Sequence, residues 1–413
     1  MKHIAIAGAG PAGAATALLL AQQGMQVTLL EQETAFDRVF RGEGLMPAGL
    51  DALYQMGLKE TFAQIPSRQL DAWDFYVGGR RRMRVVEPDR RGLATQIIDQ
   101  GALLIAMVEQ AKTLSNFEFY PGWRVSELLR GDRGEVTGLR AARQGQSQDF
   151  LVDAVIGCDG RYSRLRQLAG LQIDKSSAQF DVLWFKLPAP PSLAEETPFV
   201  ACLQPQRQFA FYPSWDGRLQ IGWIVEKKSK QALAKLKNRD WIEEFAQALP
   251  PDLAAHFRQH KDELEGPIYL DVQVGCCPQW SIPGLLLIGD AAHPMAPNRA
   301  QGINMALRDA IVVANHLAGV AESDGPIRTE TLQAIQAERQ PEIEAVQKMQ
   351  MAEWRKVALI SQPGLPYLAF KAIATAFGRF RFAQAIWLHE QQGLREGVLP
   401  VKLHLTKALS SLS

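Results

Sequence analysis

The sequence has little cysteine, no excess of charge of either sign and no long apolar run. Its four cysteines (Cys158, Cys202, Cys276 and Cys277) lack metal-ligand spacing, and the adjacent pair is a poor disulfide, so a reducing compartment fits best. With 45 basic and 44 acidic residues, no global charge favours nucleic-acid binding. No run reaches the roughly 18 apolar residues that a spanning helix requires, and the N-terminus leads directly into a strand pattern, which leaves no room for a signal peptide. We therefore expect a cytoplasmic protein with no transmembrane segment.

The first thirty-one residues have the pattern of a mononucleotide-binding unit. An apolar strand, Ile4 to Ala7, precedes a glycine-rich turn, an Ala- and Leu-rich helix follows, and a second strand ends on Glu31. The turn consists of Gly8, Ala9, Gly10, Pro11, Ala12 and Gly13. Its glycines allow a tight turn, a close approach of pyrophosphate and close helix–strand packing, and the helix N-terminus faces the phosphates. Glu31 suits a ribose hydroxyl and disfavours a 2′-phosphate, so the unit favours FAD or NAD over NADP.

Two later strands also end on polar groups. The apolar run Leu151 to Ile156 leads into a turn with Asp159 and Gly160, and the run from Gly284 ends on Asp290, where a carboxylate can bind a polyol. The backbone that begins a helix at Gln301 can stabilise negative charge. His293, followed by a proline in this turn, is better explained as a structural residue than as a catalytic base.

The middle of the chain is rich in strands. A Gly78-Gly79 turn between two strand patterns predicts a hairpin. Its arginines suit either a solvated basic edge or an anionic ligand. The stretch from about Leu171 to Gln273 predicts an antiparallel sheet with helices to one side, including a polar helical stretch from Ser229 to Leu249. Four aromatics there could line a hydrophobic pocket, although each is more often a core residue: Trp184, Phe211, Tyr212 and Trp223.

The chain is expected to be helical after Gly325. The segment from Leu365 to Trp387 mixes aromatic and basic residues, which fits a membrane-surface face or a partner groove. We favour packing of this segment on the body of the protein.

The fold class that follows is α/β: a Rossmann-like cofactor-binding domain interleaved with an antiparallel-sheet substrate domain, plus C-terminal helices. We assign residues 1–72, 100–174 and 275–328 to the first domain. Residues 73–99 with 175–274 form the second, and 329–413 the helical region.

Three separated segments together resemble the FAD-dependent aromatic hydroxylases of the para-hydroxybenzoate hydroxylase fold. They are the Gly8–Gly13 turn with Glu31, the Asp159-Gly160 turn, and the stretch from Gly289 through Asn304. Their order and separation agree with that family from end to end.

The resemblance implies FAD as cofactor and assigns roles to particular residues. Gly8 to Gly13 would hold the pyrophosphate, Glu31 the ribose and Asp290 the ribityl chain. Pro297 would lie beside the reacting face, and the Gly302, Ile303 and Asn304 backbone against the flavin pyrimidine edge. The remaining implied cofactor contacts are Arg41, Gln100, Val125 and Asp159. On residue type alone, Arg41 is equally well explained as a surface arginine.

Two positions depart from the family pattern. Gln100 stands where an arginine usually touches the cofactor, so that contact would be neutral. Ala300 replaces the first glycine of Pro-x-x-Gly-Gln-Gly, which should stiffen the turn beside the flavin.

The function implied is a monooxygenase in which NADH or NADPH reduces FAD, oxygen forms a flavin hydroperoxide, and one oxygen atom passes to an aromatic or related hydrophobic small molecule. The absence of a metal-ligand cluster, a Ser/His/Asp set or paired carboxylates agrees with chemistry carried by the cofactor. Two alternatives remain at this point: an isoprenoid reductase resembling the geranylgeranyl reductases, and a flavin-binding partner protein without turnover.

Overall fold

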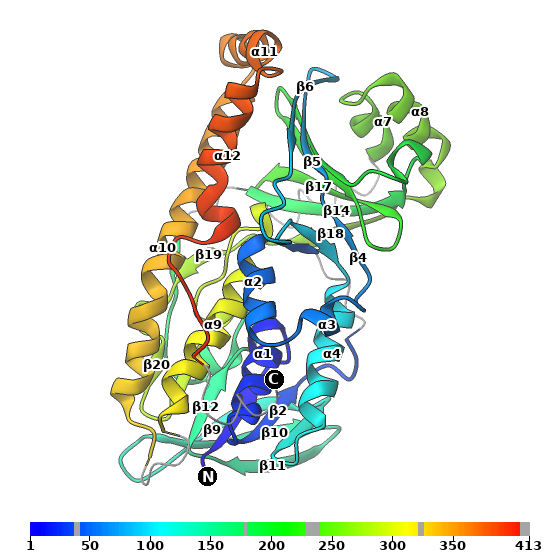
Figure 1. The fold of residues 1–413 in the computed structure, drawn as a ribbon. Helices are drawn as coiled ribbons and strands as arrows, with labels where there is room; N and C mark the ends of the chain where they lie inside the picture. The colour runs from blue at the N-terminus through cyan, green and yellow to red at the C-terminus, as the bar shows by residue number, and fades with distance from the viewer. Residues whose placement is uncertain (37–41, 177–179, 228–239, 321–325, 405–413) are drawn as a thin grey trace.

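Two large sheets and a set of long helices organise the molecule (Figure 1). The computed structural model describes residues 1–36, 42–176, 180–227, 240–320 and 326–404. The first sheet has six strands in the order β20 (Ser281–Ile282), β21 (Leu285–Leu287), β12 (Ala154–Gly157), β1 (His3–Ala7), β2 (Gln26–Glu31) and β8 (Phe117–Pro121). All neighbours are parallel except β20 and β21. The parallel sheet expected of a Rossmann-like domain is therefore present.

Helices cover this sheet, and glycines allow them to approach it closely. They are α1 (Pro11–Gln22), α4 (Gln100–Lys112) and α9 (Gln301–Ala318), with α2 (Pro47–Gln55), α3 (Lys59–Phe62) and α5 (Arg164–Leu168) nearby. A Cβ on Gly13 would lie 1.8 Å from the Gly8 carbonyl oxygen, and one on Gly8 would lie 2.4 Å from the Cys158 oxygen. Only glycine allows β1, α1 and β12 to pack at this distance.

Small sheets flank the first one. β9 (Arg124–Arg130), β10 (Val136–Arg143) and β11 (Gln146–Leu151) form one of them, β13 (Asp174–Ser176) pairs with β19 (Val274–Cys276), and β3 (Gly44–Leu45), β7 (Gln96–Ile98) and β4 (Ser67–Gln69) form another. The predicted strand Leu151 to Ile156 is wrong at its start. Leu151 pairs with Gly138 at the end of β11, and the chain joins the parallel sheet only from Ala154.

The second large sheet has seven strands. Their order is β18 (Glu265–Leu270), β14 (Phe180–Pro188), β17 (Arg218–Glu226), β16 (Arg207–Pro213), β15 (Pro198–Gln204), β5 (Ala72–Val77) and β6 (Arg80–Val86). β5 and β6 form the predicted hairpin at Gly78-Gly79, and the pairing is antiparallel except between β15 and β5. The domain boundaries themselves remain a prediction.

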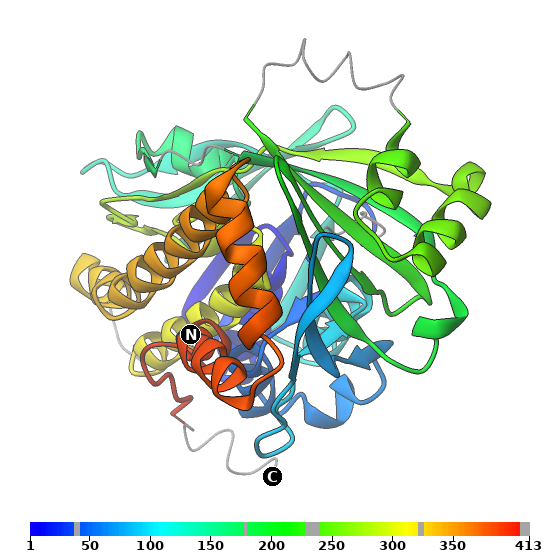
Figure 2. The same ribbon diagram turned by 90° about the horizontal axis from the view of Figure 1, so that it is seen from above.

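The seven-stranded sheet lies between two groups of helices. Figure 2 shows α7 (Trp241–Ala246) and α8 (Pro251–Gln259) on one side and the C-terminal helices on the other. Of the helical stretch expected within Ser229 to Leu249, only the part from Trp241 is confirmed, since residues 228–239 lie outside the described ranges.

The C-terminal region forms three helices, α10 (Thr329–Ile360), α11 (Leu365–Phe377) and α12 (Arg381–Glu396). α12 packs on the body, where Trp387 lies against Trp73 and Phe75. In α11, however, only Tyr367 is buried. The expectation that this segment packs on the body is thus confirmed for α12, whereas α11 contacts β6 and α10 along one side only and leaves most of its side chains exposed. In the described ranges, no helix combines the length and the apolar character that crossing a bilayer would need.

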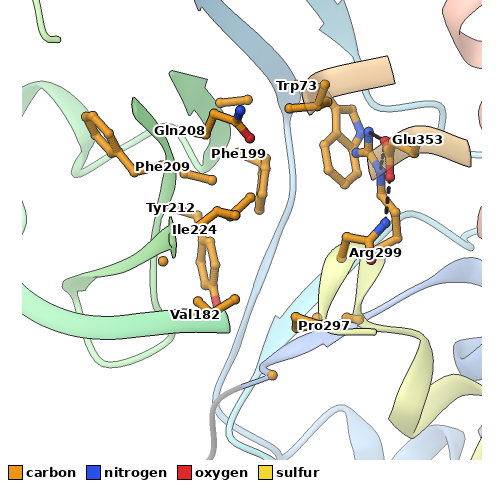
Figure 3. A pocket seen from close by; sticks show the side chains of 18 of the residues that line it. Trp73, Val182, Phe199, Gln208, Phe209, Tyr212, Ile224, Pro297, Arg299 and Glu353 are labelled. Atoms are coloured by element: carbon orange, nitrogen blue, oxygen red, sulfur yellow. Dashed lines mark hydrogen bonds and ion pairs between the residues drawn. The ribbon is translucent and has the colours of Figure 1, made fainter. Parts of the chain in front are cut away.

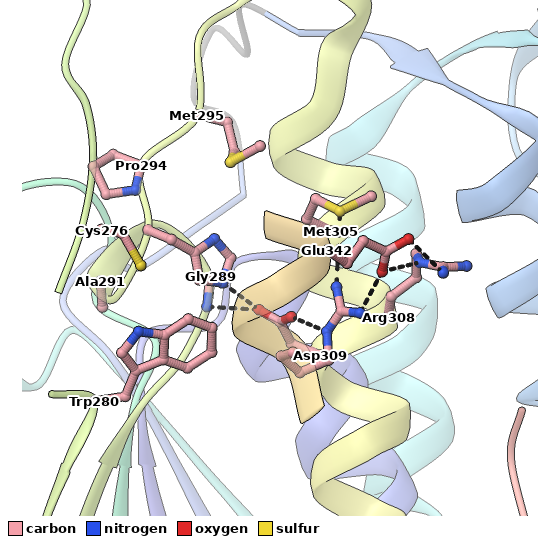
Figure 4. Close-up of polar contacts among 12 residues, drawn as sticks. Cys276, Trp280, Gly289, Ala291, Pro294, Met295, Met305, Arg308, Asp309 and Glu342 are labelled. Carbon is pink, nitrogen blue, oxygen red and sulfur yellow. Dashed lines mark hydrogen bonds and ion pairs between the residues drawn. The ribbon is translucent and has the colours of Figure 1, made fainter. Parts of the chain in front are cut away.

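A buried cluster of charges connects the end of β21 to the C-terminal helices (Figure 4). The Gly289 N–H donates to Asp309 of α9, whose other carboxylate oxygen accepts from Arg339 of α10 at 2.8 Å. Arg339 also donates to Glu342, which in turn accepts from Arg308 at 2.7 Å. Burial alone would raise the pKa of Asp309, but His293 and Arg339 outweigh it and hold that pKa well below its usual range. Each of the four buried charges, on Arg308, Asp309, Arg339 and Glu342, is therefore paired with a group of opposite charge.

His293 belongs to this cluster. Its side chain is 1 % exposed, its Nε2 lies 2.7 Å from Asp309 Oδ2, and its ring packs on Trp280. These contacts agree with the structural role favoured by the sequence.

We expect Arg339→Met to cost about 3–5 kcal/mol of unfolding free energy, because two buried carboxylates, Asp309 and Glu342, would then have only one arginine, Arg308, to balance their charge. The matched control is Lys356→Met in the same helix, which breaks an exposed ion pair with Glu390 and should cost less than about 1 kcal/mol. Urea unfolding followed by circular dichroism measures both. Equal losses in the two variants would contradict this account of the cluster.

Candidate active site

A cavity of about 790 Å³ opens at the carboxyl ends of β1, β12 and β21. This edge of a parallel sheet, where loops from neighbouring strands meet, is where α/β folds bind ligands. The lining combines the turn after β1, the turn after β12 and the segment from Asp290 to Ala306.

Half of the predicted cofactor residues line this cavity. They are Gly10, Pro11, Ala12, Gln100, Asp290, Pro297, Gly302 and Ile303. Gly8, Ala9 and Gly13 shape the turn next to it. A Cβ added to Gly10 would meet no protein atom within 4 Å, so the space above this residue is open.

Two helices begin at the cavity. α1 starts after Gly10 and α9 after Ala300, and within the described chain no side chain caps either N-terminus. Uncapped N–H groups and the positive end of the helix dipole favour an anionic ligand at such positions.

Three other predicted residues, Glu31, Asp159 and Val125, are not part of the cavity lining. The Glu31 carboxylate accepts from the Ala9 N–H at 2.8 Å. Asp159 accepts from the Leu165 N–H at 2.9 Å, while its other oxygen is buried and has no hydrogen-bond partner among the described residues. Val125 is 8 % exposed and packs in the core of the first sheet.

Asn304 has a clear structural task. Its side-chain oxygen accepts from the Met46 N–H at 2.9 Å, and its amide donates to the Ala300 carbonyl at 2.6 Å. It therefore joins α2 to the turn before α9. Arg41 lies outside the described residues.

Sequence reasoning missed several lining residues, of which Arg161 is the most significant. Its guanidinium lies 3.6 Å from Asp290 and donates to the Asp271 carbonyl at 3.0 Å. Arg161 directly follows the predicted Asp159-Gly160 turn, so its position in the sequence could have indicated a basic residue facing the cavity.

A second, smaller pocket of about 230 Å³ adjoins the first (Figure 3). The two share Gly42, Pro297 and Ala300. Most of its lining is apolar: Met46, Leu70, Trp73, Phe75, Val182, Trp184, Phe199, Tyr212, Ile224 and Trp354. An aromatic molecule in this pocket would therefore lie next to the contents of the larger cavity.

The seven-stranded sheet has the pocket on one face and a second hydrophobic core on the other, because side chains alternate between the two faces along each strand. On β14, Val182 and Trp184 line the pocket, whereas Leu183 and Phe185 pack on α7 and α8. Successive side chains of a strand point to opposite faces, so one strand serves both purposes. Of the aromatics proposed from the sequence, Trp184 and Tyr212 line the pocket and Phe211 and Trp223 belong to the core.

Arg299 closes one side of the pocket. Its guanidinium lies 4.5 Å from the Trp73 ring centre and 4.9 Å from that of Trp387, and it forms an ion pair with Glu353 at 2.5 Å. Arg299 and Ala300 both have positive φ, of 61° and 48°. The alanine in place of the family glycine thus occupies a left-handed conformation that costs L-residues about 1–2 kcal/mol.

The carboxyl group of Glu43 is the buried acid of this pocket. It is 4 % exposed, accepts from Ser214 at 2.7 Å and lies 3.6 Å from the Lys186 ammonium. Burial raises the pKa of Glu43 from 4.5 to about 7, although Ser214 and Lys186 act in the opposite direction. The group can therefore exchange a proton near neutral pH.

A family model described as an FAD binding domain matches residues 1–350. The chain belongs to the FAD-dependent aromatic hydroxylase family. This enzyme is 32 % identical over 359 residues to 6-methylpretetramide 4-monooxygenase of Streptomyces rimosus, covering 85 % of this chain and 83 % of the relative. It is 26 % identical to 6-hydroxynicotinate 3-monooxygenase of Pseudomonas fluorescens, over 83 % and 90 % of the two chains.

The fold also matches solved structures. p-Nitrophenol 4-monooxygenase of Pseudomonas putida superposes with a TM-score of 0.79 at 19 % identity, covering 97 % of this chain and 100 % of the other. FAD is the cofactor of this oxidoreductase, and the monooxygenase assignment made from three sequence segments is confirmed.

We expect Gly10→Ala to weaken FAD binding at least tenfold, because its methyl group would occupy the space left for the pyrophosphate. Gly319→Ala is the matched control, since a Cβ there also meets no protein atom. Fluorescence titration of the apoprotein with FAD measures both. Unchanged affinity in Gly10→Ala would contradict this placement of the phosphates.

We expect the stability of the Glu43→Gln variant relative to wild type to depend on pH. Because burial raises the folded-state pKa of Glu43, the stability that the protonated group contributes is complete below pH 4.5 and is lost as pH rises through about 7. Between pH 5 and 8 the variant should therefore gain up to about 3 kcal/mol relative to wild type.

Asp149→Asn is the control for this experiment. A hydrogen bond from Arg140 holds the pKa of Asp149 below its usual value, so this carboxylate, which is not among the groups that act on Glu43, is charged throughout the same pH range. Its stability difference from wild type should not change between pH 5 and 8. A flat profile for Glu43→Gln would show that Glu43 is ionised in the folded protein.

Proposed function

We propose that the enzyme hydroxylates an aromatic or related hydrophobic small molecule, with NADPH or NADH as electron donor and O2 as oxidant. The observation that carries this proposal is the apolar pocket that meets the larger cavity at Pro297 and Ala300. A substrate ring held there lies within reach of a cofactor in the cavity. Bound FAD supplies the redox chemistry, taking a hydride from the nicotinamide and activating O2 for transfer of one oxygen atom.

The larger cavity has the groups that FAD requires. We assign its pyrophosphate to the open space above Gly10 at the α1 N-terminus, and its ribityl hydroxyls to Asp290. The unpartnered oxygen of Asp159 fits a further polar contact. The uncapped N-terminus of α9 at Gly302 and Ile303 suits the negative charge of a reduced flavin.

The pocket residues have separate tasks in this proposal. Trp184, Phe199 and Tyr212 contact the ring faces and exclude water. Glu43 accepts a proton from an acidic substrate hydroxyl, for which a pKa of about 7 is well placed. Arg299 is held by Trp73, Trp387 and Glu353, so it can orient a substrate carbonyl or hydroxyl without moving.

The comparisons favour an aromatic substrate over the alternatives. The relatives described above are named as monooxygenases of ring compounds, so neither an isoprenoid reductase nor a partner protein without turnover is favoured. A phenolic substrate is the choice that uses Glu43.

The test is anaerobic mixing of the FAD-loaded enzyme with NADPH or NADH while the flavin absorbance is followed. We expect bleaching that one class among phenols, quinones and anthranilates accelerates at least tenfold, and incorporation of one ¹⁸O atom from labelled O2 into that compound. A flavin that neither nucleotide reduces under any condition would contradict the proposal.

A pocket variant separates substrate effects from cofactor effects. Ala201→Phe places a ring inside the small pocket, away from the larger cavity. It should abolish the acceleration by substrate while FAD binding and basal reduction stay within about twofold of wild type.

A further inference from the structure

The outer face of α11 is apolar, the reverse of an ordinary surface helix. Leu365, Leu368, Ile373 and Phe377 are 83 %, 57 %, 58 % and 49 % exposed. Their spacing of three to five residues places them along one side of the helix, while Tyr367 on the inner side is buried. Contiguous apolar exposure on this scale marks an interaction surface.

The apolar surface continues into the start of α12. Phe380, Phe382 and Ile386 are 44 %, 55 % and 58 % exposed, and the first two rings stack on each other 5.9 Å apart. We call the exposed apolar residues of α11 and early α12 the apical face. Figure 1 shows α11 at the extreme end of the molecule, beyond α12 and beside the β5–β6 hairpin.

Basic residues surround the apical face. Between Glu353 and Glu390 the sequence contains no acidic residue but has Arg355, Lys356, Lys371, Arg379 and Arg381. Among the described residues, no carboxylate forms an ion pair with Lys371, Arg379 or Arg381, whereas Lys356 pairs with Glu390.

The neighbouring hairpin adds more positive charge. A Cβ on Gly78 at its tip would lie 3.1 Å from the Lys371 ammonium, so the hairpin and α11 are in contact. Arg80, Arg81 and Arg82 begin β6, and of these Arg81 pairs with Asp74. The apical face is therefore an apolar ridge within a positive region.

We propose that the apical face binds the surface of an anionic lipid bilayer, with the apolar side chains in the acyl boundary and the basic ones at the headgroups. An apolar helix face flanked by Lys and Arg is the arrangement of interfacial helices. A second copy of the chain fits less well, because a two-fold interface would bring the same positive charges together. This inference is independent of the proposed substrate.

The apical face is connected to the small pocket through α10 and α12. α10 carries Trp354 and Val357 in the pocket lining, and α12 carries Trp387 against Arg299. α10 thus lines the pocket and α12 contacts it through Arg299, so these two helices connect the apical face to the pocket.

The experiment is sedimentation of the full-length, FAD-loaded protein with vesicles. We expect at least tenfold tighter binding to vesicles with about 30 % phosphatidylglycerol than to pure phosphatidylcholine, and weaker binding at high salt. Leu368→Glu/Ile373→Glu/Phe377→Glu should reduce the binding at least tenfold, and Arg379→Gln/Arg381→Gln about fivefold for each charge.

The matched control is Leu151→Glu, an equally exposed leucine in β11. It should bind vesicles as wild type does. FAD content and flavin reduction should be unchanged in all variants, so that loss of binding is distinguished from loss of fold or function. Absence of binding to anionic vesicles would overturn the proposal, as would sedimentation equilibrium showing a dimer that the triple variant dissociates.

Discussion

The buried charge cluster of Arg308, Asp309, Arg339 and Glu342 is the constraint on which the rest of the structure depends. Asp309 accepts a hydrogen bond from the Gly289 N–H, and so fixes the turn that places Asp290 at the cavity. Glu342 also accepts from the Val398 N–H, which ties down the chain after α12. One cluster therefore joins the edge of the sheet at the larger cavity to α10, which lines the pocket, and to the chain after α12. Its members must all be present, because a single buried charge without its partner is strongly destabilising.

The second constraint is the closeness of backbones where β1, α1 and β12 meet. Gly8 and Gly13 leave no room for a side chain, whereas Gly10 faces open space. Three glycines in one turn thus differ in their surroundings: the outer pair allows close packing, and the middle one borders the open cavity. The turn before α9 is built differently, since Ala300 adopts a left-handed conformation there and the Asn304 amide holds its carbonyl.

The sequence predicted the parallel sheet, the hairpin at Gly78-Gly79 and the family, because these depend on local patterns of glycine, apolar runs and turns. Eight of the residues predicted to bind the cofactor line the cavity, but no local pattern showed that Asp159 and Glu31 accept hydrogen bonds from backbone N–H groups. Glu43 and Arg299 meet partners more than fifty residues away, and no local pattern records such contacts. An exposed face on α11 was considered but not favoured from the sequence, since an apolar helix is ordinarily a packed one.

The alternation along β14, β16 and β17 has a consequence for how the enzyme can change. Pocket residues such as Trp184 and Tyr212 occupy one face, and Phe185 and Phe211 stabilise the opposite face against α7 and α8. Apart from Phe209, which lines the pocket and also belongs to the second core, a substitution on the first face alters the shape of the pocket and leaves the packing of the second face intact. Selection can therefore adjust substrate preference one residue at a time without a matching loss of folding stability. The pocket face of this sheet is free to vary in sequence, whereas the face that packs on α7 and α8 is nearly fixed.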